Sequence, residues 1–255
     1  VENPDGTPIQ RHTYDGLEYM AIVDKFFVQG GAFGGYADKT SWTFDFDNLS
    51  WKKVASAPDS LFNNVTDYDP VSGTVIMRAT RFLFQYDPIS NRWTEIGQGN
   101  DYSTDGKTGA FDYIRREFVF IGRGQGYVFD LKNGTSGLQQ RSLSSTGATE
   151  ILSSETPGFV YDWASERFVA WAGGANVYSL NMATLSWSKH LPTNSVVPAS
   201  PPEKGTFGRF RYIPSKNAFV VVSSVDSNVF IYKLSNNVAT FSVPATPGQP
   251  TVDVK

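Results

Sequence analysis

Apolar and polar residues alternate along most of the chain, in short runs separated by turns. Runs such as TFDFD (43–47), LFQYD (83–87) and VYSLN (177–181) place every second side chain on the same face of an extended backbone. A period of two is typical of half-buried β-strands, whereas an amphipathic helix has a period of 3.6. Because no stretch shows the helical period, the pattern predicts an all-β protein.

The alternating runs belong to a unit that occurs five times and contains four predicted strands. The first strand carries an aromatic column at Tyr19, Tyr68, Phe111, Tyr161 and Tyr212. The second strand is apolar. The third strand aligns as one column of Phe44, Phe84, Phe129, Tyr178 and Phe230, followed by a second column of Phe46, Tyr86, Leu131, Leu180 and Tyr232. The fourth strand begins at Trp51, Trp93 and Trp187, and the third and fifth copies have Leu138 and Phe241 instead.

Four strands repeated about every 40–55 residues predict a β-propeller, in which neighbouring blades bury each other's apolar faces. The aromatic columns are therefore expected at the interfaces between blades. We expect blades at about 14–58, 59–99, 100–148, 149–198 and 199–244. These five form either a complete ring or part of a six- or seven-bladed ring. Residues 1–13 read as an N-terminal arm or linker, and the Pro- and Thr-rich residues 245–255 read as a C-terminal linker.

The double glycines at 30–31 and 173–174, together with the FDFDN step and the tryptophan that follows it, resemble kelch repeats. The resemblance covers roughly residues 14–244 and implies a kelch-type, galactose-oxidase-like propeller. The segments RHTYDGLEY and GTFGRFRYIPSKNAFVVVSSVDSNVFIYKL are similar to secreted bacterial kelch-type proteins, which implies an extracellular location. Galactose-oxidase chemistry needs copper held by histidines and a Cys–Tyr crosslink. This chain has no Cys and only His12 and His190, so the resemblance does not carry that activity.

Composition narrows the possible partners. The formal net charge of −3 argues against a nucleic-acid partner, because phosphate binding requires a basic surface. No apolar run is long enough to span a bilayer. With no Cys and two distant histidines we expect no metal and no cofactor. Glycosylation sequons begin at Asn48, Asn64 and Asn133.

The candidate site residues are arginines with a neighbouring histidine and tyrosine. Arg11, His12 and Tyr14 precede the first inner strand, where His12 and Tyr14 would share one face of an extended strand. Arg123 lies in a glycine-rich loop, and Arg209 and Arg211 alternate on one face of the segment GTFGRFRY, which leads into the last inner strand. Around a channel mouth, these four arginines would bind carboxylate or sulfate groups. His12 and Tyr14 are the weak candidates for proton transfer.

Three functions remain open from the sequence. The first is an extracellular binding or scaffolding propeller that engages carbohydrate. The second is a carbohydrate-active enzyme such as a polysaccharide lyase, in which Arg11 neutralises a uronic acid while His12 or Tyr14 moves a proton. The third is a module that binds another protein chain or domain, since a fold alone does not select among these.

Overall fold

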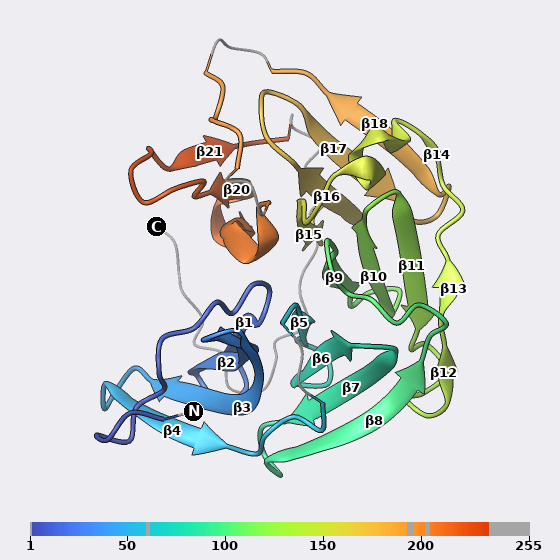
Figure 1. Cartoon of the computed structure of the whole chain (residues 1–255). Helices are drawn as coiled ribbons and strands as arrows, with labels where there is room; N and C mark the ends of the chain where they lie inside the picture. Colours follow the sequence, from blue (N-terminus) through green and yellow to red (C-terminus); the bar gives the residue numbers. More distant parts are fainter. Residues whose placement is uncertain (1, 60–61, 193–195, 202–204, 235–255) are drawn as a thin grey trace.

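The computed structural model describes residues 2–59, 62–192, 196–201 and 205–234. Five β-sheets stand around a central axis like the blades of a propeller (Figure 1), which confirms the predicted all-β, five-bladed architecture. In the described residues the helical elements are three short 3-10 turns: η1 (Thr149–Ser153), η2 (Phe207–Arg209) and η3 (Pro214–Lys216). No helix in these ranges is long and apolar enough to cross a membrane.

Blades 1 and 2 are antiparallel sheets in which each strand pairs with the next along the chain. Blade 1 contains β1 (Leu17–Met20), β2 (Lys25–Phe33), β3 (Tyr36–Asp45) and β4 (Ser50–Val54). Blade 2 contains β5 (Val65–Asp69), β6 (Thr74–Ala79), β7 (Phe82–Asp87) and β8 (Arg92–Gln98). In both blades the first strand lies nearest the axis and the fourth lies at the rim (Figure 1).

Blades 3 to 5 follow the same plan with changes at the rim. Blade 3 contains β9 (Thr108–Asp112), β10 (Glu117–Gly122), β11 (Gln125–Asp130) and the two-residue β13 (Arg141–Ser142). Blade 4 contains β15 (Gly158–Asp162), β16 (Arg167–Trp171), β17 (Val177–Asn181) and β18 (Ser186–His190). Blade 5 has three described strands, which are β19 (Phe210–Ile213), β20 (Ala218–Val221) and β21 (Phe230–Tyr232). Phe241, predicted for its fourth strand, and the predicted linker 245–255 lie outside the described residues.

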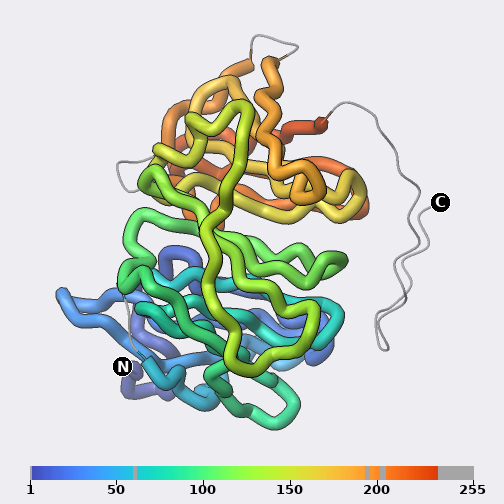
Figure 2. The backbone as a smooth tube through the Cα atoms, turned by 90° about the vertical axis from the view of Figure 1, so that its right-hand side faces the viewer, coloured from blue at the N-terminus to red at the C-terminus, as the bar shows by residue number. Residues whose placement is uncertain are grey.

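The segment after β11 corrects the prediction for the third copy. Leu138 belongs to β12 (Leu138–Gln139), which pairs in parallel with β8 at the rim of blade 2. The chain then pairs β13 with β11 in blade 3, and β14 (Thr146–Gly147) with β18 in blade 4. Figure 2 shows this stretch running across the outside of the molecule. The third copy has no rim tryptophan because its rim segment links three blades and contributes only two residues to its own sheet.

The strand register also corrects the alignment of the third strands. Phe44 lies opposite Trp51, and Tyr86 lies opposite Trp93. Phe44 is therefore equivalent to Tyr86, and the predicted columns were shifted by two residues in blade 1. Phe129 pairs with Phe118 and shows the same shift in blade 3. A shift of two keeps side chains on the same face of a strand, so the predicted buried face was unaffected.

One interface recurs between successive blades. Each blade presents a cross-strand row, here called the leading row, that begins with the first-strand aromatic and packs on the preceding blade. The leading row of blade 4, for example, contains Tyr161, Phe168, Leu180 and Trp187. The opposite face, here called the trailing face, carries Phe27, Ile76, Val119, Val169 and Val220 on the second strands of blades 1 to 5. Each pair of successive blades buries a leading row on a trailing face, as Phe168 and Leu180 do with Val119.

Gly31 allows the N-terminal arm to lie against β2. His12 and Ala32 form an antiparallel bridge, with hydrogen bonds of 3.0 and 2.9 Å in the two directions. A Cβ atom on Gly31 would lie 2.3 Å from the carbonyl oxygen of His12, and the φ of Gly31 is +100°. The position thus requires glycine both for close approach and for backbone conformation.

The aromatic column predicts that losing its tyrosine destabilises the protein more in blade 4 than in blade 1. Tyr161 is buried between blades 3 and 4, whereas Tyr19, its equivalent in blade 1, is 49% exposed. Tyr161→Ala should lower the free energy of unfolding by about 3–5 kcal/mol, as large-to-small changes in a core do. Tyr19→Ala should lower it by about 1 kcal/mol or less. Urea denaturation of both variants tests this contrast, and equal losses would show that the two tyrosines have the same packing.

Candidate functional site

Polar side chains from three blades meet inside the ring of innermost strands. Glu18 lies on β1, Asp67 on β5 and Arg211 on β19. Asp15 precedes β1 and forms a parallel bridge with Val65. Because strand side chains alternate, Glu18, Asp67 and Arg211 point away from the aromatic column that includes Tyr19, Tyr68 and Tyr212. The same alternation that builds the blade interfaces therefore brings charges to the axis.

Arg211 joins the last blade to the first. Its Nη2 donates to the carbonyl oxygen of Leu17 at 2.9 Å, and its Nε donates to the carbonyl oxygen of Gly208 at 2.8 Å. Its Nη1 lies 3.5 Å from Oε2 of Glu18. The side chain as a whole remains 38% exposed.

The three carboxylates are fixed by hydrogen bonds. Glu18 accepts a bond of 2.8 Å from the hydroxyl of Thr66. Asp67 accepts backbone N–H bonds from Phe111 at 2.7 Å and from Tyr68 at 2.9 Å. Asp15 accepts a longer bond, 3.4 Å, from the backbone N–H of Gly109.

Burial and mutual repulsion keep protons on this group. Burial, reinforced by the charge of Glu18, raises the pKa of Asp67 to about 8. Burial also raises the pKa of Asp15 and of Glu18. Burial alone would lower the pKa of Arg211, but the three neighbouring carboxylates outweigh it and raise that pKa. Burial and the neighbouring Glu18 therefore favour the protonated form of the Asp67 carboxyl.

A cavity of about 480 Å³ opens above Asp67 and Arg211 at one end of the axis. Eight aromatic side chains line it, of which Phe111, Phe159 and Tyr161 are buried. The other five, one from each blade and here called the aromatic mouth, are Tyr19, Tyr68, Tyr113, Trp163 and Tyr212. All except the more exposed Tyr19 are half-buried. Each ring is thus held by the protein while part of its surface remains available to a ligand.

A second cavity, of about 610 Å³, lies among the segments that precede the innermost strands. It holds two of the predicted site residues, Tyr14 and Arg123. Arg123 is held between two acids, with Nη1 2.7 Å from Asp105 and Nε 3.0 Å from Glu155. All three side chains are substantially exposed, so solvent screening weakens these pairs.

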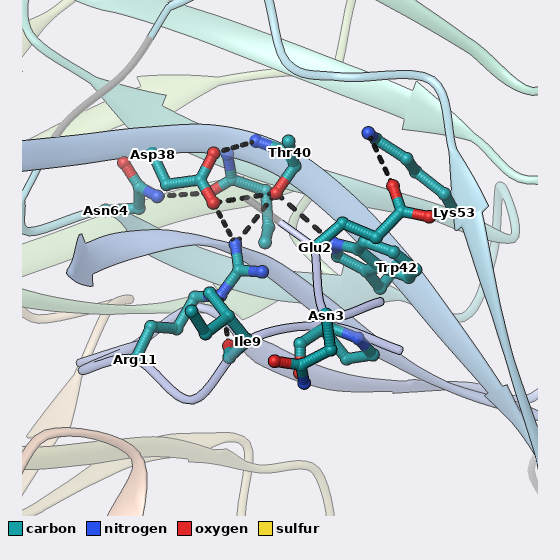
Figure 3. Close-up of polar contacts among 11 residues, drawn as sticks. Glu2, Asn3, Ile9, Arg11, Asp38, Thr40, Trp42, Lys53 and Asn64 are labelled. Carbon is teal, nitrogen blue, oxygen red and sulfur yellow. Dashed lines mark hydrogen bonds and ion pairs between the residues drawn. The ribbon is translucent and has the colours of Figure 1, made fainter. Parts of the chain in front are cut away.

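Arg11 lies in neither cavity. Its guanidinium forms an ion pair with Asp38 and donates to the hydroxyl of Thr40 at 2.8 Å and to the carbonyl oxygen of Ile9 at 3.2 Å (Figure 3). Only 2% of the side chain is exposed. In this arrangement Arg11 fastens the N-terminal arm to β3.

The remaining predicted residues also have separate positions. The ring of His12 is exposed and lies 6.1 Å from the ring of Tyr14, which in turn lies 5.3 Å from Phe207. Tyr14 has a φ of +54°, so the extended strand expected through His12 and Tyr14 is interrupted there. Arg209 donates to the backbone carbonyl oxygens of Thr206 at 3.1 Å, Ser223 at 2.7 Å and Gly205. The structure thus brings Tyr14 and Arg123 to one cavity and Arg211 to the other.

Sequence reasoning missed Glu18, Asp67 and most of the aromatic mouth as site residues. The signal was present in the first strands, where Glu18 precedes Tyr19 and Asp67 precedes Tyr68. Alternation puts a charge next to the leading-row aromatic on the trailing face of its strand, in register with Phe27 for Glu18 and with Ile76 for Asp67. On an innermost strand this is the part of the trailing face nearest the axis.

No known protein-family model and no curated protein sequence matches this chain. The likeness to kelch-type proteins therefore remains a resemblance. Across the described ranges, no group of three or more His, Cys, Asp or Glu side chains is placed to hold a metal ion.

Asp67 should make stability depend on pH. Its pKa of about 8 exceeds the ordinary value of 3.8, so between these values the folded protein binds a proton that the unfolded chain releases. The contribution of Asp67 is therefore fully present below about pH 3.8 and is lost as pH rises through about 8. Asp67→Asn should flatten the decline in unfolding free energy between pH 5 and pH 8, measured by urea denaturation. A variant with the wild-type pH slope would show that Asp67 titrates normally.

Proposed function

We propose that the aromatic mouth binds a neutral carbohydrate and that the protein is a binding propeller. The observation that carries this proposal is the set of five aromatic rings, one from each blade, around a polar floor. Aromatic rings pack against the C–H faces of sugar rings. A site lined with aromatic groups and a few fixed polar groups is typical of ligand pockets.

The floor favours hydroxyl groups over anions. Arg211 and the protonated Asp67 can donate hydrogen bonds, and the carboxylate oxygens can accept them. The single positive charge of Arg211 is already opposed by Glu18, with Asp15 close by. An acidic sugar would meet these carboxylates, so the acidic polysaccharides favoured by the sequence-based hypothesis fit this cavity less well.

The proposal includes an extracellular location, supported by the resemblance to secreted bacterial kelch-type proteins. Two of the three sequons, at Asn48 and Asn133, are exposed in turns. The third, at Asn64, is buried and its side-chain nitrogen donates to Gln29. In the folded protein only the first two of these asparagines are accessible to a modifying enzyme.

Loss of a ring from the aromatic mouth should weaken carbohydrate binding. An array of neutral and acidic oligosaccharides would identify the ligand, and calorimetry would give its dissociation constant. Trp163→Ala and Tyr212→Ala should each raise that constant about tenfold or more, equivalent to about 1.4 kcal/mol. The matched control is Tyr36→Ala, because Tyr36 is 79% exposed at the start of β3 and lies outside the mouth.

Two outcomes would reject this proposal. One is the absence of binding to any neutral glycan on the array. The other is cleavage of an acidic glycan with growth of unsaturated-product absorbance that His12→Ala abolishes. That second result would favour a polysaccharide lyase.

A further inference from the structure

The leading rows of blades 2 to 5 are closed interfaces. At the second-strand position, Val75, Phe118 and Phe168 are fully buried and Phe219 is 1% exposed. Each packs on the trailing face of the preceding blade, as Phe219 does on Val169. Four copies of the interface therefore show what this row binds: an apolar face of another β-sheet, aliphatic at the second strand of blades 2 to 4 and formed by Phe27 in blade 1.

The leading row of blade 1 has the same chemistry but is not closed. It crosses the sheet through Tyr19, Phe26, Phe44 and Trp51. Phe26 and Phe44 are only half-buried, and the neighbouring Phe46 is 48% exposed. The rings contact one another, with Phe44 5.1 Å from Trp51 and 5.5 Å from Phe46, but no sheet formed by the described residues covers them.

The trailing face of blade 5 is open in the same way. Val220 is half-buried, whereas the equivalent residues Phe27, Ile76, Val119 and Val169 are all fully buried. Ile231, its neighbour on β21, is 60% exposed. Blades 5 and 1 thus present complementary apolar faces, an aliphatic one and an aromatic one, that are not packed together.

Polar and aromatic contacts near the axis join these two blades. Arg211 binds the Leu17 carbonyl, and Tyr14 packs on Phe207. Among the described residues no hydrophobic cluster connects blade 5 with blade 1, although clusters connect every other successive pair. Figure 1 shows the outer strands of these two blades diverging from the axis, with β21 and β3 far apart.

We propose that this seam between blades 5 and 1 is an interaction surface that takes one β-sheet of a partner polypeptide. The four internal interfaces define its chemistry: an aliphatic face toward Phe26 and Phe44, and an aromatic face toward Val220 and Ile231. A single sheet in the seam would contact both the trailing face of blade 5 and the leading row of blade 1, because both line the seam.

A blade-like sheet attached to the full chain tests the surface directly. The probe is a copy of residues 156–190, which include β15 to β18, joined after residue 255 by a flexible Gly/Ser linker. This copy carries an aromatic row on one face and Val160 and Val169 on the other. The linker provides a high local concentration, so docking does not depend on affinity in trans.

Because the sequence contains no cysteine, one introduced cysteine at a time reports how accessible its surface is to a thiol reagent. Phe46→Cys and Ile231→Cys place a thiol on the two sides of the seam, and Ile89→Cys places a control thiol in an exposed turn of blade 2. In the fusion, modification by a thiol reagent should slow at least tenfold at positions 46 and 231 and stay unchanged at position 89. Adding Ile231→Asp to the Phe46→Cys fusion should restore the fast rate, and because Ile231 is exposed this variant should still fold.

Each other result overturns the proposal. Unchanged rates at positions 46 and 231 would show that the faces do not take a sheet, and slowing at all three positions would indicate aggregation. If the unfused chain instead forms dimers that Ile231→Asp disrupts, the occupant is a second copy of this chain. Positions 46, 89 and 231 do not line the aromatic mouth, so failure here is separate from failure of carbohydrate binding.

Discussion

The packing of one sheet's largely aromatic row against the apolar face of the preceding sheet is the interaction on which this molecule depends. A four-stranded sheet has two faces and cannot bury either of them alone. Phe168 packing on Val119 and Phe219 packing on Val169 provide that burial for neighbouring blades. Because the interface recurs with similar geometry, the first strands are brought to a common axis, and every functional feature described above follows from that arrangement.

The charged residues at the axis result from the same alternation of side chains along the first strands. A first strand that turns its aromatic residue to the leading face turns the intervening residue to the trailing face, and Glu18, Asp67 and Arg211 meet at the axis end of that face. Charges crowded there lose solvent, which is why the pKa of Asp67 rises to about 8. The aromatic mouth lies above them because the first-strand aromatic residues of all five blades are close to the same end of the axis. A polar floor under aromatic walls thus results from strand periodicity combined with ring closure near the axis.

The sequence was sufficient for the fold because its information is periodic. Alternation and the recurring aromatic column predicted five blades, and an alignment shifted by two residues still placed Phe44 and Phe129 on the buried face. The site was harder to predict because it depends on long-range placement. Nothing in the segment around Arg11 indicates that Asp38, on a distant part of blade 1, binds its guanidinium. Arg209 likewise binds carbonyl oxygens brought near by the turn η2 and the loop after β20, and backbone groups leave no sequence signal.

The axis and the seam share residues. The shape of the cavity therefore depends on the distance between blades 5 and 1. Arg211 is both the floor of the cavity and the link from β19 to Leu17. Tyr19 belongs both to the aromatic mouth and to the open leading row of blade 1. A sheet that pushed blades 1 and 5 apart would have to lengthen the 2.9 Å bond from Arg211 to Leu17 and would move Tyr19 relative to Tyr212. A sheet held outside Arg211 would cover Phe44 and Ile231 and leave the floor of the cavity in place. The exposed side chains favour the second geometry, since Ile231, which is 60% exposed, lies on β21, the outermost described strand of blade 5.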